Sequence, residues 1–261
     1  MGRTAIEWTD VTDNIIVAAR GGWWCRKKSP ACRRCYAERL NQSAFFGGNG
    51  LKYTGKPPKL ELRRDILESW ARARIPRKRF VASMTDVFGE WVPDGWCMEF
   101  LDAMAAAPQQ TFLLLTKRAD VMRYQFQMWL FLTNRQRVPS NIWPGATVER
   151  QIEAEERLPA LCAIPSDVHW ISAEPLIGPL DLDRWELDWV VTGGESGPGS
   201  EASRADDFRH LRDQCVRRGI RFFFKQWGDH DCRGRRVGKK RAGRRLDGRL
   251  WNQWPEITAT E

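Results

Sequence analysis

Short apolar runs recur along this chain, and each is followed by a cluster of polar residues and, in most cases, by a helical pattern. We predict strands at these runs: 79–83, 111–115, 141–148, 168–172, 187–191 and 220–224. A further strand is expected ahead of them, at 6–8 or 14–17. Helices are predicted up to Pro108 and over 119–136, 150–162 and 205–218, whereas no long helix follows 168–172. This alternation indicates βα units and a parallel sheet.

Two architectures are compatible with this many βα units, an open doubly wound sheet and a barrel, because right-handed crossovers build both. Pro144 weakens the strand at 141–148 or places it at an edge, since proline cannot donate to a strand ladder. In either architecture the C-terminal strand ends emerge on one face, where ligands bind.

Polar residues stand at these strand ends and are expected to converge on one mouth, together with the cysteine-rich loop after the first strand. The alternative is that they only cap the helices that follow. They are Ser83, Thr85, Asp86, Thr116, Lys117, Arg118, Thr147, Glu149, Ser172, Glu174, Gly193, Gly194, Glu195, Lys225 and Gln226.

The composition is that of a globular protein, since 42% of the 261 residues are hydrophobic. The longest apolar run, 128–132, is too short to span a bilayer, and the N-terminus has no signal-peptide pattern. We therefore expect a soluble, cytoplasmic protein without membrane contact. Seven cysteines in such a protein argue against a disulfide framework and for metal or redox chemistry.

Positive charge gathers near the C-terminus. The formal net charge is +9, and residues 229–250 carry nine Lys or Arg against three Asp. This suggests a partner that bears phosphates, although a solvated basic tail has the same composition. The fourteen Trp residues are suited either to base stacking or to the core, and the sequence alone does not separate these uses.

Three of the cysteines, Cys25, Cys32 and Cys35, form the pattern C-x6-C-x2-C. Zinc at this loop needs a fourth ligand, or a water if the zinc is catalytic. A [4Fe–4S] cluster held by three thiolates leaves one iron open, and that iron can bind the amino-acid end of S-adenosylmethionine. Three unconnected structural cysteines are the remaining alternative.

The other cysteines lie outside this pattern. Cys97, Cys162 and Cys215 fall on apolar helical faces and are expected to be core thiols. Cys232 follows His230 and Asp231, which is compatible with a second metal or with a solvated turn.

Over about residues 6–254 the chain resembles a phage-associated three-cysteine family of largely unknown function that is regarded as radical-SAM-like. The resemblance rests on the cysteine loop and on ordered motifs at 83–86, 115–118, 146–149, 172–179, 193–199, 223–228 and 246–251. It departs from the common radical-SAM pattern in two ways. The common spacing is C-x3-C-x2-C, and the common aromatic before the last cysteine is Arg34 here, with Tyr36 following instead.

The resemblance implies an α/β fold, a partial (β/α) barrel of about six to seven parallel strands, over residues 1–228, with a basic C-terminal extension over 229–261. It also implies a [4Fe–4S] cluster on Cys25, Cys32 and Cys35 and bound S-adenosylmethionine. The cofactor-binding residues expected on this basis are Tyr36, Ser83, Asp86, Thr116, Lys117, Thr147, Glu149, Glu174, Gly193, Gly194 and Glu195. A phage-encoded member would act in the host-cell cytoplasm.

Two functions follow as hypotheses. The first is a radical S-adenosylmethionine enzyme that modifies a nucleic-acid base or a nucleotide, with hypermodification of phage DNA as one form; a free small-molecule substrate is the alternative. The second is a non-enzymatic nucleic-acid-binding protein with a structural zinc or iron–sulfur site. Whether the protein has protein partners is not determined by the sequence.

Overall fold

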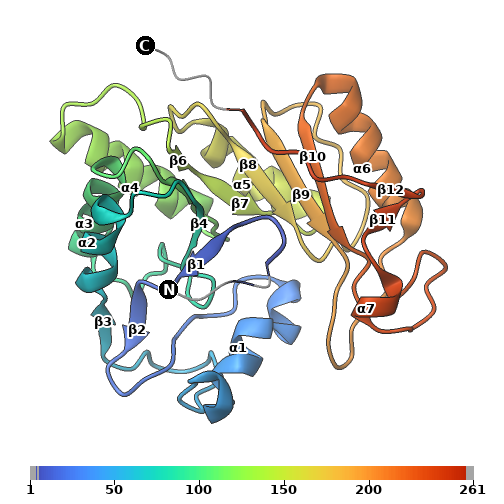
Figure 1. Ribbon diagram of the computed structural model, residues 1–261, viewed down its shortest axis with the longest axis horizontal. Helices are drawn as coiled ribbons and strands as arrows, with labels where there is room; N and C mark the ends of the chain where they lie inside the picture. Colours follow the sequence, from blue (N-terminus) through green and yellow to red (C-terminus); the bar gives the residue numbers. More distant parts are fainter. Residues whose placement is uncertain (1–3, 5, 257–261) are drawn as a thin grey trace.

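Parallel strands form the centre of the molecule, as the apolar runs predicted (Figure 1). The computed structural model describes residues 4 and 6–256, so the outermost residues of the two predicted regions, 1–3, 5 and 257–261, lie outside the described residues. One sheet has the order β1-β4-β5-β6, formed by Val11–Asp13, Lys78–Val81, Thr111–Leu113 and Ile142–Trp143. The other has the order β10-β9-β8-β7, formed by Arg221–Gln226, Trp189–Gly193, Trp170–Ala173 and Gly145–Thr147.

The two sheets meet at Pro144, which separates β6 from β7. Proline has no N–H to donate, so the strand predicted at 141–148 is interrupted there. The residues after β5 continue the pairing across this point: Thr116 forms a parallel bridge with Ala146, and the Thr116 amide donates to the Gly145 carbonyl at 3.1 Å. The strand order therefore follows the chain order across both sheets.

Helices connect the strands at the predicted places. They are α3 (Asp94–Ala105), α4 (Ala119–Leu132), α5 (Gln151–Cys162) and α6 (Ala205–Arg218). The segment after β8 contains no helix, and Leu176, Leu180 and Leu182 from this segment are buried instead. Among the described helices none is long and apolar enough to cross a membrane.

The N-terminal part differs from the prediction. The strand that pairs with β4 is β1 at Val11–Asp13, between the two positions expected. The predicted run at 14–17 contributes to β2 (Ile16–Ala18), which pairs antiparallel with β3 (Leu60–Leu62) outside the main sheets. The helix α2 (Arg64–Arg72) after β3 was not predicted. These elements are too short for periodicity to identify them.

A cluster of aromatic side chains connects the two sheets. The ring of Trp8 lies 4.7 Å from that of Phe80 on β4 and 5.2 Å from that of Trp170 on β8. Trp143 and Trp189 pack in the same cluster. Several of the tryptophans are thus core residues, because an indole contributes a large apolar area.

The C-terminal basic segment packs on the second sheet. Its elements are α7 (Lys239–Ala242) and the hairpin β11–β12 (Arg245–Leu246 and Arg249–Leu250). Leu246 is buried, and the Phe224 amide of β10 donates to the Trp251 carbonyl at 2.9 Å. The Trp254 indole donates to the Trp8 carbonyl at 3.2 Å. Figure 1 shows this segment beside β10 and α6.

A buried ion pair fixes β1 to β4. Asp13 accepts hydrogen bonds from Arg79 and from the Trp70 indole, each at 2.8 Å, and the side chains of Asp13 and Arg79 are 3% and 2% exposed. Removing one partner of such a pair is costly because the other charge stays buried.

We therefore expect Asp13→Asn to lower the free energy of unfolding by about 3–5 kcal/mol, measured by urea denaturation. Asp65→Asn, which breaks the exposed pair with Arg63, is the matched control and should cost less than about 1 kcal/mol. Equal losses in the two variants would contradict a special role for the buried pair.

Candidate functional site

The cysteine loop lies between β2 and α1 (Tyr36–Asn41). Two bonds hold its first part: the Thr85 hydroxyl donates to the Trp24 carbonyl at 2.9 Å, and the Trp23 amide donates to the Asn41 side chain at 2.8 Å. The 3-10 helix η1 (Pro30–Arg34) carries Cys32, and Cys35 is the residue before α1. The three thiols therefore lie between the C-terminal end of β2 and the N-terminus of α1.

The three thiols occupy different electrostatic surroundings. Burial and the nearby charge of Asp86 raise the pKa of Cys25 to about 12. Burial also raises the pKa of Cys35, although the amides at the start of α1 oppose it. For Cys32 the effect of burial is outweighed by Lys117 and by bonds from Lys28 and Ser29, which lower its pKa. The thiols also act on one another: the charge of Cys35 raises the pKa of Cys25, and the charge of Cys32 raises the pKa of Cys35.

A buried carboxylate joins the loop to the strand ends. Glu149, after β7, is 1% exposed and accepts from the Ser29 hydroxyl at 2.6 Å and from Arg157 at 2.9 Å. Lys117, after β5, forms an ion pair with the same carboxylate and donates to Ser29 at 2.8 Å. Burial raises the pKa of Glu149, but Lys117 and Arg157 outweigh it and hold the pKa below its ordinary value. Glu149 is thus ionised and already has three donors.

A second carboxylate, Asp86, organises the ends of β4 and β5. It accepts from the Thr116 hydroxyl at 2.7 Å and from Arg118 at 3.2 Å, and its charge raises the pKa of the Cys25 thiol. Arg118 stacks 4.6 Å from the ring centre of Trp91 and donates to the Arg26 carbonyl at 3.3 Å. The charges at these strand ends therefore also act on the pKa of Cys25, which Asp86 raises and Arg118 lowers.

The remaining predicted glutamates are also paired. Glu174 forms an ion pair with Lys225 at 3.1 Å, and Glu195 accepts from Arg34 of the cysteine loop at 3.0 Å. The backbone is tightly packed here: a side chain at Gly193 would lie 2.8 Å from a Glu174 oxygen, and one at Gly194 would lie 2.0 Å from the Trp227 carbonyl. These glycines bring β9 close to β8 and to the end of β10.

Tyr36 connects α1 to the end of β4 by donating to the Ser83 carbonyl at 2.8 Å. Burial of its hydroxyl raises the pKa, although the residue as a whole is 44% exposed. Ala82, next to Ser83, has a φ of 60°, a strained backbone conformation for a residue other than glycine. The Asn14 side chain supports this turn by accepting from the Met84 amide at 3.1 Å.

The predicted site residues are thus gathered around the cysteine loop, mostly through contacts among themselves. Thr147 takes part through its carbonyl, which accepts from Arg157 at 2.6 Å. Sequence reasoning missed Ser29, Asn14 and Arg157. A hydroxyl three residues before Cys32 gives no recognisable signal, and Arg157 lies on α5 away from any motif.

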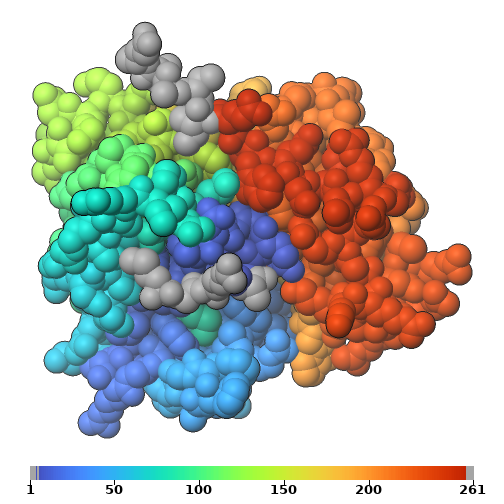
Figure 2. Space-filling model, in the orientation of Figure 1, coloured from blue at the N-terminus to red at the C-terminus, as the bar shows by residue number. Residues whose placement is uncertain are grey.

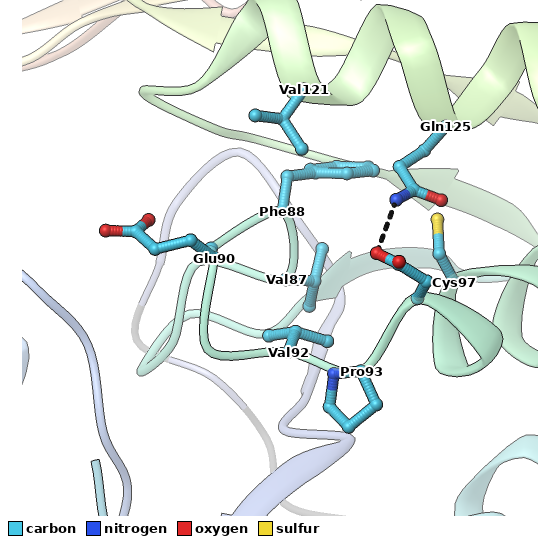
Figure 3. A pocket seen from close by; sticks show the side chains of 10 residues that line it. Val87, Phe88, Glu90, Val92, Pro93, Cys97, Val121 and Gln125 are labelled. Atoms are coloured by element: carbon cyan, nitrogen blue, oxygen red, sulfur yellow. Dashed lines mark hydrogen bonds between the residues drawn. The ribbon is translucent and has the colours of Figure 1, made fainter. Parts of the chain in front are cut away.

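Two hollows among the described residues lie away from the cysteine loop. One, of about 70 Å³, lies between the segment after β4 and helix α4, and Figure 3 shows Phe88, Cys97 and Val121 on its walls. There the Gln125 amide donates to Asp94 at 3.2 Å. The other is an open depression of about 360 Å³ between α2 and α3. Contact of the predicted cofactor-binding residues with a small molecule therefore stays a prediction.

The donor set of the cysteine loop differs in its suitability for a single metal ion and for an iron–sulfur cluster. Within residues 4 and 6–256, no group of three or more His, Cys, Asp or Glu side chains is arranged to hold a single metal ion. One zinc ion would draw its thiolates to within about 3.8 Å of one another, given Zn–S bonds of about 2.3 Å. In a [4Fe–4S] cluster each thiolate binds a different iron, so the thiols need to surround the group and not converge on one point. The three thiols of the loop match that donor set in number.

Comparison with known proteins places the chain in a family. Residues 3–255 match the family described as Protein of unknown function (DUF5131), and the chain belongs to that family. No curated protein matches the chain. No solved structure matches it either.

The pairing of Glu149 predicts a pH-dependent effect of Glu149→Gln. A carboxyl whose pKa is lowered in the folded state stabilises the fold above its unfolded value of about 4.3, and that contribution is lost as the pH falls through the lower folded value. Chemical denaturation should therefore show Glu149→Gln to be less stable than wild type at pH 7, with a difference that shrinks below about pH 4.

The matched control is Glu156→Gln, which removes only the half-exposed partner of Lys28. It should change stability by less than about 1 kcal/mol. If Glu149→Gln equalled wild type at pH 7, the carboxylate would not hold the loop.

Proposed function

We propose that this protein is a radical S-adenosylmethionine enzyme in which Cys25, Cys32 and Cys35 hold a [4Fe–4S] cluster, on a partial (β/α) barrel. The observation that carries the proposal is the joining of a three-thiol loop to the C-terminal ends of parallel strands, through Ser29 to Glu149 and Lys117 and through Arg34 to Glu195. Ligands of parallel α/β proteins bind at that face. When bound, the cluster and S-adenosylmethionine together supply a 5′-deoxyadenosyl radical that removes hydrogen from a substrate.

The chain's own residues act by holding the loop. Lys117 lowers the pKa of Cys32, so this thiol is the readiest of the three to lose its proton to a metal group. Cys25 and Cys35 have raised pKa values, and an iron–sulfur group must displace their protons when it binds. The Arg34–Glu195 and Lys225–Glu174 pairs supply charged groups with which the amino and carboxylate groups of S-adenosylmethionine would pair when bound.

The competing function is a nucleic-acid-binding protein with a structural zinc. A structural zinc site is closed by four ligands that converge on one ion. The described thiols do not form such a set, and they stand next to buried charges that a closed structural site does not require. What supports the iron–sulfur alternative is the number of thiols on the loop, one for each of three irons.

A nucleic-acid base or nucleotide is the proposed substrate. The support is the net charge of +9 and the basic residues 233–249, part of which face solvent. Pairing reduces this charge, since Arg235 contacts Asp231 at 2.8 Å and Lys239 contacts Glu7 at 3.2 Å. A base within a duplex must leave the stack to be modified.

Cys25→Ala, Cys32→Ala and Cys35→Ala should each abolish binding of the cluster, because each thiolate is the sole protein ligand of one iron. The measurements are iron content and visible absorbance after anaerobic reconstitution. Cys97→Ala and Cys215→Ala, at buried cysteines on α3 and α6, are the controls and should load fully. Full iron in Cys25→Ala would remove that residue from the site.

The decisive experiment on the function is cleavage of S-adenosylmethionine. The reduced, reconstituted protein should form 5′-deoxyadenosine and methionine slowly even without substrate, detected by chromatography of the quenched reaction. If the protein with a fully loaded cluster gives no 5′-deoxyadenosine in the presence of a strong reductant and candidate nucleic acids, the enzyme assignment is wrong. The hypothesis of a non-enzymatic nucleic-acid-binding protein is then the one that stands.

A further inference from the structure

Two phenylalanines stand exposed on the lobe that carries the cysteine loop. Phe45 and Phe46 lie in the 3-10 helix η2 (Ala44–Phe46) and are 89% and 54% exposed, with their rings edge to face at 5.0 Å. Neither ring belongs to the buried clusters of the described chain. Two exposed rings in contact form a small contiguous aromatic patch, and contiguous apolar patches mark sites of interaction.

The loop that presents these rings is firmly held. Asn41, fully buried, donates through its side chain to Asn49 and to the Leu51 carbonyl, each at 2.9 Å, and its own carbonyl accepts from Gly50. Gly48 passes so close to Asn41 that a side chain there would lie 2.1 Å from the Asn41 carbonyl. The aromatic pair is thus a preorganised surface, whose ordering cost is already met in the free protein.

The same lobe is strongly basic. Residues 33–59 carry six Lys or Arg against a single acidic residue, Glu38, which is buried and paired with Lys27 at 2.8 Å. Arg33, Lys52 and Lys56 are exposed, and among the described residues they form no ion pair. Figure 2 shows this light-blue segment at the lower edge of the molecule, away from the C-terminal basic hairpin.

Exposed aromatics and unpaired cations on the same lobe favour one class of partner. Bases of a single strand stack on aromatic rings while Lys and Arg bind the phosphates, and neither contact requires a defined sequence. In a duplex the base faces are occupied by their neighbours, so the rings would gain nothing. A protein partner of matching chemistry would need acidic residues around an apolar patch.

We propose that Phe45 and Phe46, with Arg33, Lys52 and Lys56, form a binding surface for single-stranded nucleic acid next to the cysteine loop. This inference deepens the proposed function and rests on it for the identity of the substrate. It specifies that the nucleic-acid substrate is single-stranded, or locally unpaired, where it is bound beside the site. Arg33 lies between Cys32 and Cys35, and η2 packs against α1, the helix that begins after Cys35, so a strand on this surface would pass close to the thiol loop.

The test is fluorescence anisotropy of the full-length protein with a labelled dT12 oligonucleotide and with a 12-base-pair duplex. Wild type should bind dT12 more tightly than the duplex. Phe45→Ala/Phe46→Ala should weaken dT12 binding by at least about thirtyfold, since the variant removes two stacked bases that contribute about 1–3 kcal/mol each. Phe131→Ala, at an 80% exposed phenylalanine on α4 on another side of the molecule, is the control and should bind as wild type does.

The charges are tested by Lys52→Gln/Lys56→Gln. This variant should lower the slope of log affinity against log salt by about 1.4, because single strands give about 0.7 per phosphate contact. Both double variants should have the melting temperature of wild type in thermal denaturation, since all four side chains are exposed.

Equal dT12 affinity of wild type and Phe45→Ala/Phe46→Ala would overturn the inference. So would a concentration-dependent dimer that the same substitutions disrupt, because the rings would then serve a second copy of the chain. Binding is independent of cofactor chemistry. If wild type binds dT12 but makes no 5′-deoxyadenosine, the binding surface stands and the enzyme assignment is refuted. If wild type makes 5′-deoxyadenosine but does not bind dT12, only the binding surface is refuted.

Discussion

The buried carboxylate of Glu149 is the interaction on which the site depends. It accepts from Ser29, Lys117 and Arg157 while 1% exposed, so three donors compensate the loss of water. Ser29 belongs to the cysteine loop, Lys117 follows β5 and Arg157 comes from α5. One charge therefore sets where the loop stands relative to the sheet, and the electrostatic surroundings of Cys32 follow from it, since the same Lys117 acts on that thiol.

Much of the architecture was predictable because its signals are local. Apolar runs of four or five residues followed by polar clusters identified β4, β5, β8, β9 and β10, and 3.6-residue periodicity identified α3 to α6. The first strand was misplaced because three-residue strands such as β1 carry no periodic signal, and the pairing of β1 with β4 depends on contacts 60 to 70 residues apart, such as Asp13 with Arg79.

The candidate site was predictable in its members and not in its contacts. Parallel strands place their ends on one face, so Asp86, Lys117, Glu149, Glu174 and Glu195 were expected together. That each carboxylate already has a cationic partner was not foreseen, because ion pairing depends on side chains such as Arg34 and Arg157 that come from other elements. Ordered charges of this kind favour a preorganised site over one that forms on binding.

The break at Pro144 has a consequence for how the candidate site is assembled. It divides the parallel strands into two groups, and the groups contribute different halves of the site: Asp86 and Lys117 come from the first, and Glu149, Glu174 and Glu195 come from the second. The Lys117–Glu149 ion pair crosses that division. This ion pair thus links the two sheets at their C-terminal ends, and the ring of Trp8 links them a second time by packing against strands of both sheets.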